Sequence, residues 1–149
     1  MWLALGALAG FAIFGVMVWR AVDVVDAAPA DATAQFEEVR TRFGSQPPLL
    51  AFDDQGRLVR GETTAPTAPA PIGHLRVLSY RAPTGRLARA RVAIWFLKLK
   101  GPAAQLVLRD TGLDLAALRL TAADLERAGP AIVLDRKSAS GDRLLVWTE

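Results

Sequence analysis

Eight basic side chains lie between residues 63 and 109, a stretch that contains no acidic residue. Elsewhere the charges are mixed, with five basic and eight acidic residues in 1–62 and five and seven in 110–149. A surface of this sign attracts acidic protein segments or anionic lipid headgroups. The basic residues are Arg76, Arg81, Arg86, Arg89, Arg91, Lys98, Lys100 and Arg109, and Trp95 and Phe96 lie just before the last two lysines.

We predict that part of this tract is an interaction surface for an acidic partner protein or an anionic membrane. Its expected residues are Arg76, Arg81, Arg89, Arg91, Trp95, Lys98 and Lys100. The alternative is that the arginines are ordinary solvated residues on strand faces. Nucleic acid is a poorer partner, because the net charge is only +3 and no nucleic-acid-binding motif is present.

Residues that usually carry catalysis or bind metals are scarce. The chain has no cysteine and a single histidine, His74, with no further ligand at a metal-binding spacing. Asp53 and Asp54 precede Gln55-Gly56 and suit a turn, and no glycine-rich phosphate loop is present. We therefore expect no enzymatic activity, cofactor or metal. The alternative is a ligand-binding or catalytic pocket built from sequence-remote residues such as His74, Tyr80 and carboxylates.

The first nineteen residues contain no charged and no strongly polar side chain. As an α-helix they span about 28 Å, close to the ~30 Å hydrocarbon core of a bilayer. Trp2 and Trp19 stand at the two ends, where interfacial aromatic rings are common, and Arg20 closes the segment. We predict that residues 1–20 form a single-pass transmembrane helix, a signal-anchor that tethers the rest of the chain to a membrane.

Two features of this segment leave alternatives open. Ala30-Asp31-Ala32 resembles a signal-peptidase site, so a cleaved signal peptide is the alternative to a retained anchor. Gly6 and Gly10 have the spacing at which two membrane helices approach closely, which would make the chain a homodimer. Few basic residues flank the segment, so they do not fix which side of the membrane holds the remaining chain.

The positions after the anchor indicate one domain. Residues 21–30 are typical of a juxtamembrane spacer, and residues 31–149 are enough for one core. Within them, residues 61–73 are rich in proline and predict an exposed loop. The helical spacing of Phe36, Val39 and Phe43 predicts a helix that begins near residue 31 or 33 and ends at residue 44.

The residues of the basic tract are positioned by a predicted pair of strands, 75–81 and 86–94, joined by a turn at 82–85. Alternation places Arg89 and Arg91 on one face of the second strand, which we expect to point outward, and Ala88, Ala90 and Val92 on a core face. Residues 94–100 suit either a strand or a helix. Further elements are expected as hairpins 49–52 with 57–60 and 131–135 with 143–148, and as helices over 102–109 and 121–129. Thr121 is expected to cap the last helix, with Asp124 completing a capping box.

These elements predict an α+β fold, with an antiparallel sheet of about four to six strands and short helices packed on one face. With the anchor, the sequence favours a non-enzymatic, single-pass membrane-anchored interaction or accessory module.

Overall fold

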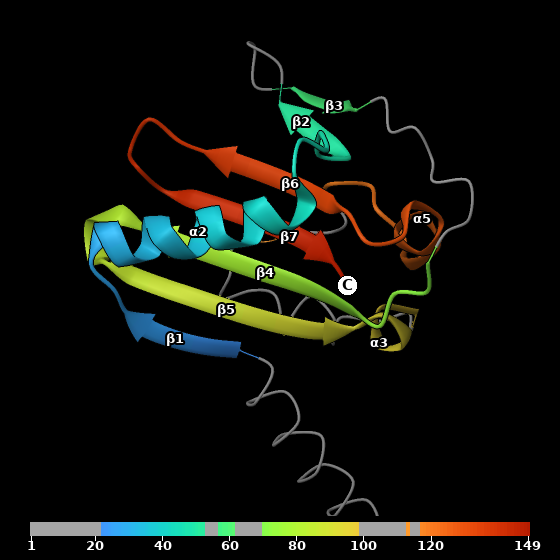
Figure 1. Ribbon diagram of the computed structural model, residues 1–149, viewed down its shortest axis with the longest axis horizontal. Helices are drawn as coiled ribbons and strands as arrows, with labels where there is room; N and C mark the ends of the chain where they lie inside the picture. The colour runs from blue at the N-terminus through green and yellow to red at the C-terminus, as the bar shows by residue number, and fades with distance from the viewer. Residues whose placement is uncertain (1–21, 53–56, 62–69, 99–112, 114–116) are drawn as a thin grey trace, which may run out of the picture.

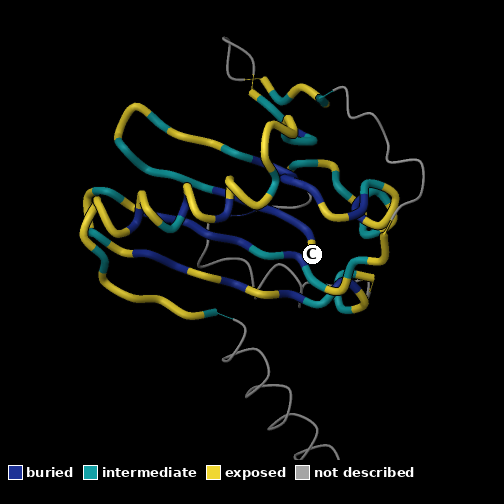
Figure 2. Tube along the Cα trace, viewed as in Figure 1, coloured by how far each residue is buried: buried dark blue, intermediate teal, exposed yellow. Residues whose placement is uncertain are grey.

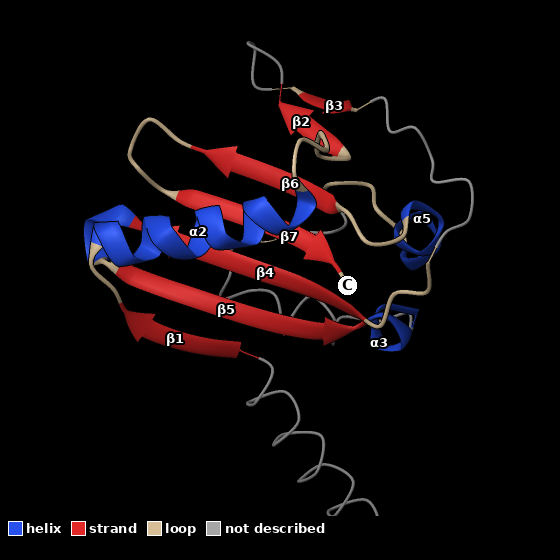
Figure 3. Ribbon diagram, viewed as in Figure 1, coloured by secondary structure: helices blue, strands red, loops and turns tan. Residues whose placement is uncertain are grey.

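A computed structural model of the chain describes residues 22–52, 57–61, 70–98, 113 and 117–149. In this part of the chain seven strands form one sheet, in the spatial order β1-β5-β4-β7-β6-β2-β3 (Figure 1). The strands are β1 (Val22–Asp26), β2 (Leu50–Phe52), β3 (Leu58–Arg60), β4 (His74–Arg81), β5 (Arg86–Ala93), β6 (Ile132–Lys137) and β7 (Arg143–Thr148). The described helices are α2 (Pro29–Phe43), α3 (Ile94–Lys98) and α5 (Ala122–Ala128), with a 3₁₀ turn η1 (Ala82–Thr84). The predicted α+β class is confirmed (Figure 3).

α2 crosses one face of the sheet, where it covers a hydrophobic cluster (Figure 1). Phe36 is fully buried and Val39 nearly so, and they pack with Leu78 of β4 and Leu87 of β5. The predicted apolar stripe is therefore confirmed. The helix begins earlier than expected, at Pro29, because proline has a preset φ and lacks only an N–H that the first turn leaves unpaired.

Two antiparallel hairpins form the centre of the sheet, and both were predicted. β4 pairs with β5 over its whole length, and Gly85, at φ +63°, closes the turn between them. β6 pairs with β7, and β4 joins β7 to complete a four-strand centre. These strands are the most buried part of the trace in Figure 2. The centre of the fold is thus built from short-range pairs with strong alternation.

The opposite face of the sheet carries a second hydrophobic cluster. Val77 and Val92 meet Val133 and Val146 there, and α5 adds the buried Leu125. Short helices were expected on one face only; this is wrong, because α2 packs on one cluster and α5 on the other. A fully antiparallel sheet is also not found, since β2 pairs with β6 in parallel at a single register position.

No sequence pattern predicted β1, which lies within the stretch 21–30 expected to be a spacer. It is an edge strand whose paired neighbour is β5, with Val22 opposite Ala90 and Asp26 opposite Arg86. Aspartate is depleted in strands, so the sequence Val-Asp-Val-Val-Asp gives a weak local signal. Its formation depends on β5, a partner sixty or more residues away along the chain.

Several predictions fall on residues outside the described ranges. They are the anchor over 1–20 with Gly6 and Gly10, the turn at Asp53 and Asp54, the helix over 102–109, most of the proline-rich loop, and the basic residues Lys100 and Arg109. Among the helices that the structure does describe, none has the length and apolar character needed to cross a bilayer.

Candidate interaction groove beside α2

The basic residues do not share one surface. Arg76, Arg89 and Arg91 occupy the face of the sheet on which α2 packs, because each lies an even number of residues from the buried Leu78 or Leu87. Arg81 and Arg86 are register partners beside the η1 turn, at the other end of the strands. Lys98 lies in α3. The β4–β5 pair therefore separates a tract that is continuous in the sequence.

An open groove of about 490 Å³ lies between α2 and the strands β1, β5, β4 and β7. α2 crosses the sheet obliquely and leaves part of β4 and β5 uncovered (Figure 1). Four arginines and three acidic residues line the groove: Arg42, Arg76, Arg89, Arg91, Asp23, Glu38 and Glu149. Arg89 and Arg91 are exposed, as expected, and they line an open hollow beside a helix.

Three of the four guanidinium groups in the groove already have partners. Arg89 Nε donates to the side-chain oxygen of Gln35 at 3.1 Å, and its Nη1 lies 3.4 Å from Asp23 Oδ2. Arg76 Nε donates to Glu149 Oε1 at 2.6 Å. Arg42 pairs with Glu38 within α2. Two arginines of the basic tract, Arg76 and Arg89, are thus paired with acidic side chains from elements that are remote in the sequence.

Arg91 differs from these three arginines. It is exposed, lines the groove, and has no ion-pair or hydrogen-bond partner among the residues that the structure describes. It also lies one position beyond the last residue of β5 that β1 covers, since Ala90 pairs with Val22. A guanidinium in this position can bind a carboxylate by donating two parallel hydrogen bonds, without breaking an existing pair.

Glu149 sets the electrostatics at one end of the groove. Partial burial acts to raise the pKa of this carboxyl, but the hydrogen bond and positive charge of Arg76 outweigh it, and the Trp147 indole N–H and the charge of Arg42 add to the lowering. The pKa of Glu149 therefore lies below its ordinary value of 4.5. The group is ionised at neutral pH and holds Arg76 in place.

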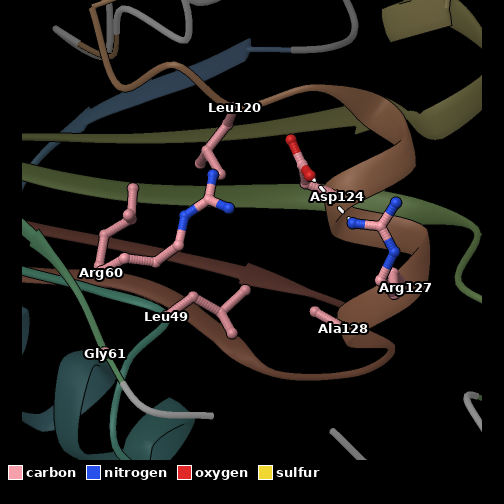
Figure 4. A pocket seen from close by; sticks show the side chains of 8 residues that line it. Leu49, Arg60, Gly61, Leu120, Asp124, Arg127 and Ala128 are labelled. Carbon is pink, nitrogen blue, oxygen red and sulfur yellow. Dashed lines mark hydrogen bonds and ion pairs between the residues drawn. The ribbon is translucent and has the colours of Figure 1, made fainter.

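A second, smaller hollow of about 210 Å³ lies between β3 and α5 (Figure 4). Arg60 and Arg127 flank Asp124 in it. The Asp124 carboxylate accepts hydrogen bonds from the Thr121 hydroxyl at 2.7 Å and the Thr121 backbone N–H at 3.1 Å. The Asp124 backbone N–H in turn donates to the Thr121 hydroxyl oxygen at 3.2 Å, which completes the capping box of α5. These bonds lower the pKa of Asp124. This carboxylate is a helix cap rather than a proton donor, and the predicted capping box is confirmed.

The residues of the alternative pocket are not brought together. His74 begins β4 and Tyr80 lies six residues further along the same strand, about 20 Å away. Tyr80 is buried beneath α2, and its hydroxyl has no hydrogen-bond partner among the described residues. No group of histidine, cysteine and acidic residues suited to a metal ion occurs in the described ranges.

Trp95 and Lys98 lie apart from the groove, in α3. Trp95 is 56% exposed, and its ring meets that of Phe96 edge to face, with 5.9 Å between the centroids. Lys98 Nζ forms an ion pair of 2.7 Å with Glu126 of α5. The ambiguous stretch after β5 is therefore helical as far as residue 98, and it presents an aromatic side chain to the outside.

Sequence reasoning missed the acidic half of the groove. Asp23, Gln35 and Glu149 come from β1, α2 and the residue after β7, at separations of 54 to 73 residues from the arginines that they contact. No local pattern identifies such pairs; the one available signal is that acidic residues are confined to the segments on either side of the tract. No family model, curated protein or solved structure matches this chain.

Proposed function

We propose that this chain is a non-enzymatic, single-pass membrane-anchored interaction module that binds an acidic segment of a partner protein in the groove beside α2. The uncharged residues 1–19 supply the anchor, and the domain beginning at β1 supplies the binding surface. The observation that carries the proposal is Arg91, an exposed guanidinium without a described partner in a hollow whose other charges are already paired.

The composition of the groove favours a protein segment over a flat anionic bilayer. Asp23, Glu38 and Glu149 line it together with the arginines, so a uniformly negative surface would meet repulsion as well as attraction. A peptide can place a carboxylate at Arg91 and a neutral or basic side chain near the acids. A volume of about 490 Å³ also lies within the usual range for binding clefts.

The paired residues give the groove a fixed shape before binding. Arg89 is held by Gln35 of α2 and by Asp23 of β1, so it connects the wall of the groove to its floor. Arg76 of β4 is held by Glu149, the residue that follows β7. These pairs hold the side chains on either side of Arg91, so a ligand that contacts Arg91 has to order that one guanidinium rather than the whole groove.

The proposal is tested by the affinity of the full chain, in detergent micelles, for a fluorescein-labelled oligoglutamate peptide. Arg91→Glu is compared with Arg86→Glu, a matched control because both arginines are exposed on β5 and only Arg91 lines the groove. Reversing a charge that contacts the ligand is expected to weaken binding at least ~10-fold, about 1.4 kcal/mol, whereas the control stays near wild type.

An equal loss of affinity in the two variants would show that only overall charge matters and would remove the groove from the proposal. Anionic vesicles provide the second arm of the experiment. If they displace the peptide from the wild-type chain but not from Arg91→Glu, the groove binds lipid headgroups, and the assignment to a protein partner is wrong.

A further inference from the structure

We propose that the corner of the domain formed by the start of β1 and by α3 rests on the surface of the bilayer, with the Trp95 ring in the interfacial layer. This inference rests on the anchor in the proposed function and adds an orientation of the domain on its membrane. It concerns α3 rather than the groove, so the two proposals are carried by different residues.

The length of the connecting chain places β1 close to the membrane. Arg20 ends the uncharged segment, and β1 begins at Val22, so one residue separates them. Two residue steps span at most about 7 Å of extended chain. The headgroup layer on each side of the hydrocarbon core is itself about 5–7 Å thick. The first residues of β1 therefore lie at or just above the headgroups.

The register of the sheet brings α3 to the same corner. Val22 pairs with Ala90 of β5, and α3 follows β5 directly at Ile94. Ile94 lies four residue steps beyond Ala90, a rise of about 13 Å along the strand. Figure 1 shows β1 and α3 along the same margin of the sheet. A surface that lies beside the start of β1 thus also lies within reach of α3.

The apolar side chains exposed at this corner suit a lipid interface. Trp95 has the largest exposed fraction, 56%, of the large hydrophobic residues that the structure describes, and Val24 of β1 is 37% exposed. The edge-to-face contact with Phe96 braces the indole in its exposed position. Tryptophan favours the headgroup level, because its ring is apolar and its N–H can remain hydrated.

The charges around Trp95 agree with this placement. Lys98 lies three residues further along α3, on the same side of the helical turn, and remains half exposed while it pairs with Glu126. A lysine in this position can extend its charged group to lipid phosphates while its stem covers apolar surface. Asp26, the last residue of β1, lies four residues beyond Val22 and faces the η1 end of the sheet. Two acidic side chains at this corner are paired with basic ones, Glu126 with Lys98 and Asp23, the second residue of β1, with Arg89.

The chain contains no cysteine, which allows single probes to be introduced without background labelling. Trp95→Cys in the full chain is labelled with a polarity-sensitive fluorophore and reconstituted into phosphatidylcholine vesicles that carry a nitroxide high on the acyl chain. Thr84→Cys is the matched control, since Thr84 is exposed in η1 at the other end of β5. Val24→Cys is a second probe of the same corner, should the Trp95 variant fold poorly.

We expect the probes at positions 95 and 24 to be quenched several-fold more strongly by the lipid nitroxide than the probe at position 84. Equal quenching at positions 95 and 84, in a chain that resists alkaline carbonate extraction, would overturn the orientation and leave the anchor intact. Extraction of the chain by carbonate would overturn both the anchor and this inference. Protection of position 95 from aqueous iodide without lipid quenching would show that a second copy covers the corner, and would also overturn the inference.

Discussion

Both faces of the sheet carry a buried hydrophobic cluster, but they differ in the residues that surround it. The face opposite α2 presents an unbroken apolar set on β5, Ala88, Ala90 and Val92. The α2 face of the same strand places the buried Leu87 beside Arg89 and Arg91, both exposed. Strand alternation is equally regular on both faces. The difference lies in coverage, because α2 shields only part of its face and leaves the rest as the groove.

The groove therefore lies on the face that α2 covers only in part. On β5 the face opposite α2 buries Ala88, Ala90 and Val92, whereas the α2 face keeps a hydrophobic cluster and a row of charges side by side. The charges also secure the cover: Arg143 of β7 pairs with Glu37 and lies over the Phe36 ring, and Arg40 pairs with Asp135 of β6. α2 is thus held by its apolar stripe and by ion pairs along its length.

The largest effect is expected from removing the Phe36 side chain, which α2 buries against the sheet, because this weakens the packing of α2 on its face. Phe36 is completely buried, and the Arg143 guanidinium lies 4.4 Å from the centre of its ring. Phe36→Ala is expected to lower the free energy of unfolding by about 3–5 kcal/mol, because it leaves a cavity and removes the support for Arg143. Urea unfolding of the full chain in detergent micelles measures the change.

Phe36→Leu is the control for this prediction. It keeps most of the buried volume, so it is expected to lose less than half as much stability as the alanine variant. If the two variants unfold at the same urea concentration as wild type, α2 contributes little to the stability of the domain, and the groove has no rigid wall.

The opposite face has its own sensitive point, a fully buried polar side chain. The Thr148 hydroxyl donates to the Gly129 carbonyl at 2.6 Å and accepts from the Ala131 backbone N–H at 3.0 Å, which ties β7 to the end of α5. Thr148→Val keeps the shape but leaves both backbone groups unpaired, so a loss of about 1–3 kcal/mol in unfolding free energy is expected.

Thr148→Ser distinguishes the contribution of the hydroxyl to stability from that of the methyl group. It keeps both hydrogen bonds and deletes one methyl, for an expected loss of about 0.8 kcal/mol. Urea unfolding again provides the measurement. A valine variant as stable as the serine variant would contradict the role given to the hydroxyl.

The sequence predicted the elements whose signal is local. The stripe of Phe36 and Val39, the alternation of β5 and the cap at Thr121 each depend on residues within one turn or one strand, and the structure confirms them. The edge strand β1, the parallel β2–β6 contact and the placement of helices on both faces depend on partners far along the chain. Patterns within one helix or strand do not predict such contacts.

The candidate site was also hard to predict, because its charges come from segments far apart in the sequence. The tract of arginines was visible in the sequence, but its expected positive surface required that no acidic residue lie nearby in space. Glu149 is 73 residues from Arg76 and Asp23 is 66 residues from Arg89, yet both pairs meet in the groove. Charge segregation along a chain therefore does not establish charge segregation on a surface, because strand pairing brings distant segments together.

The smallest expected effect is the pH dependence contributed by Glu149 at the groove. Folding lowers the pKa of this carboxyl, so its ionised form stabilises the folded state at pH values above its ordinary pKa of 4.5. That contribution is lost as the pH falls through the lowered pKa of the folded state. Glu149→Gln is therefore expected to be less stable than wild type at neutral pH, and the difference should disappear in acid.

The size of this difference is below about 1 kcal/mol, because the Glu149 side chain is 37% exposed and water and salt screen its pair with Arg76. Urea midpoints of both proteins between pH 7 and pH 3 measure it, with added salt expected to reduce it further. Asp124→Asn, in the hollow beside α5, should show the same direction of pH dependence, since hydrogen bonds from Thr121 lower the pKa of Asp124. A gap between wild type and Glu149→Gln that stays constant across this pH range would mean that Arg76 gains nothing from the charge of Glu149, and Arg76 would then be as available to an acidic ligand as Arg91.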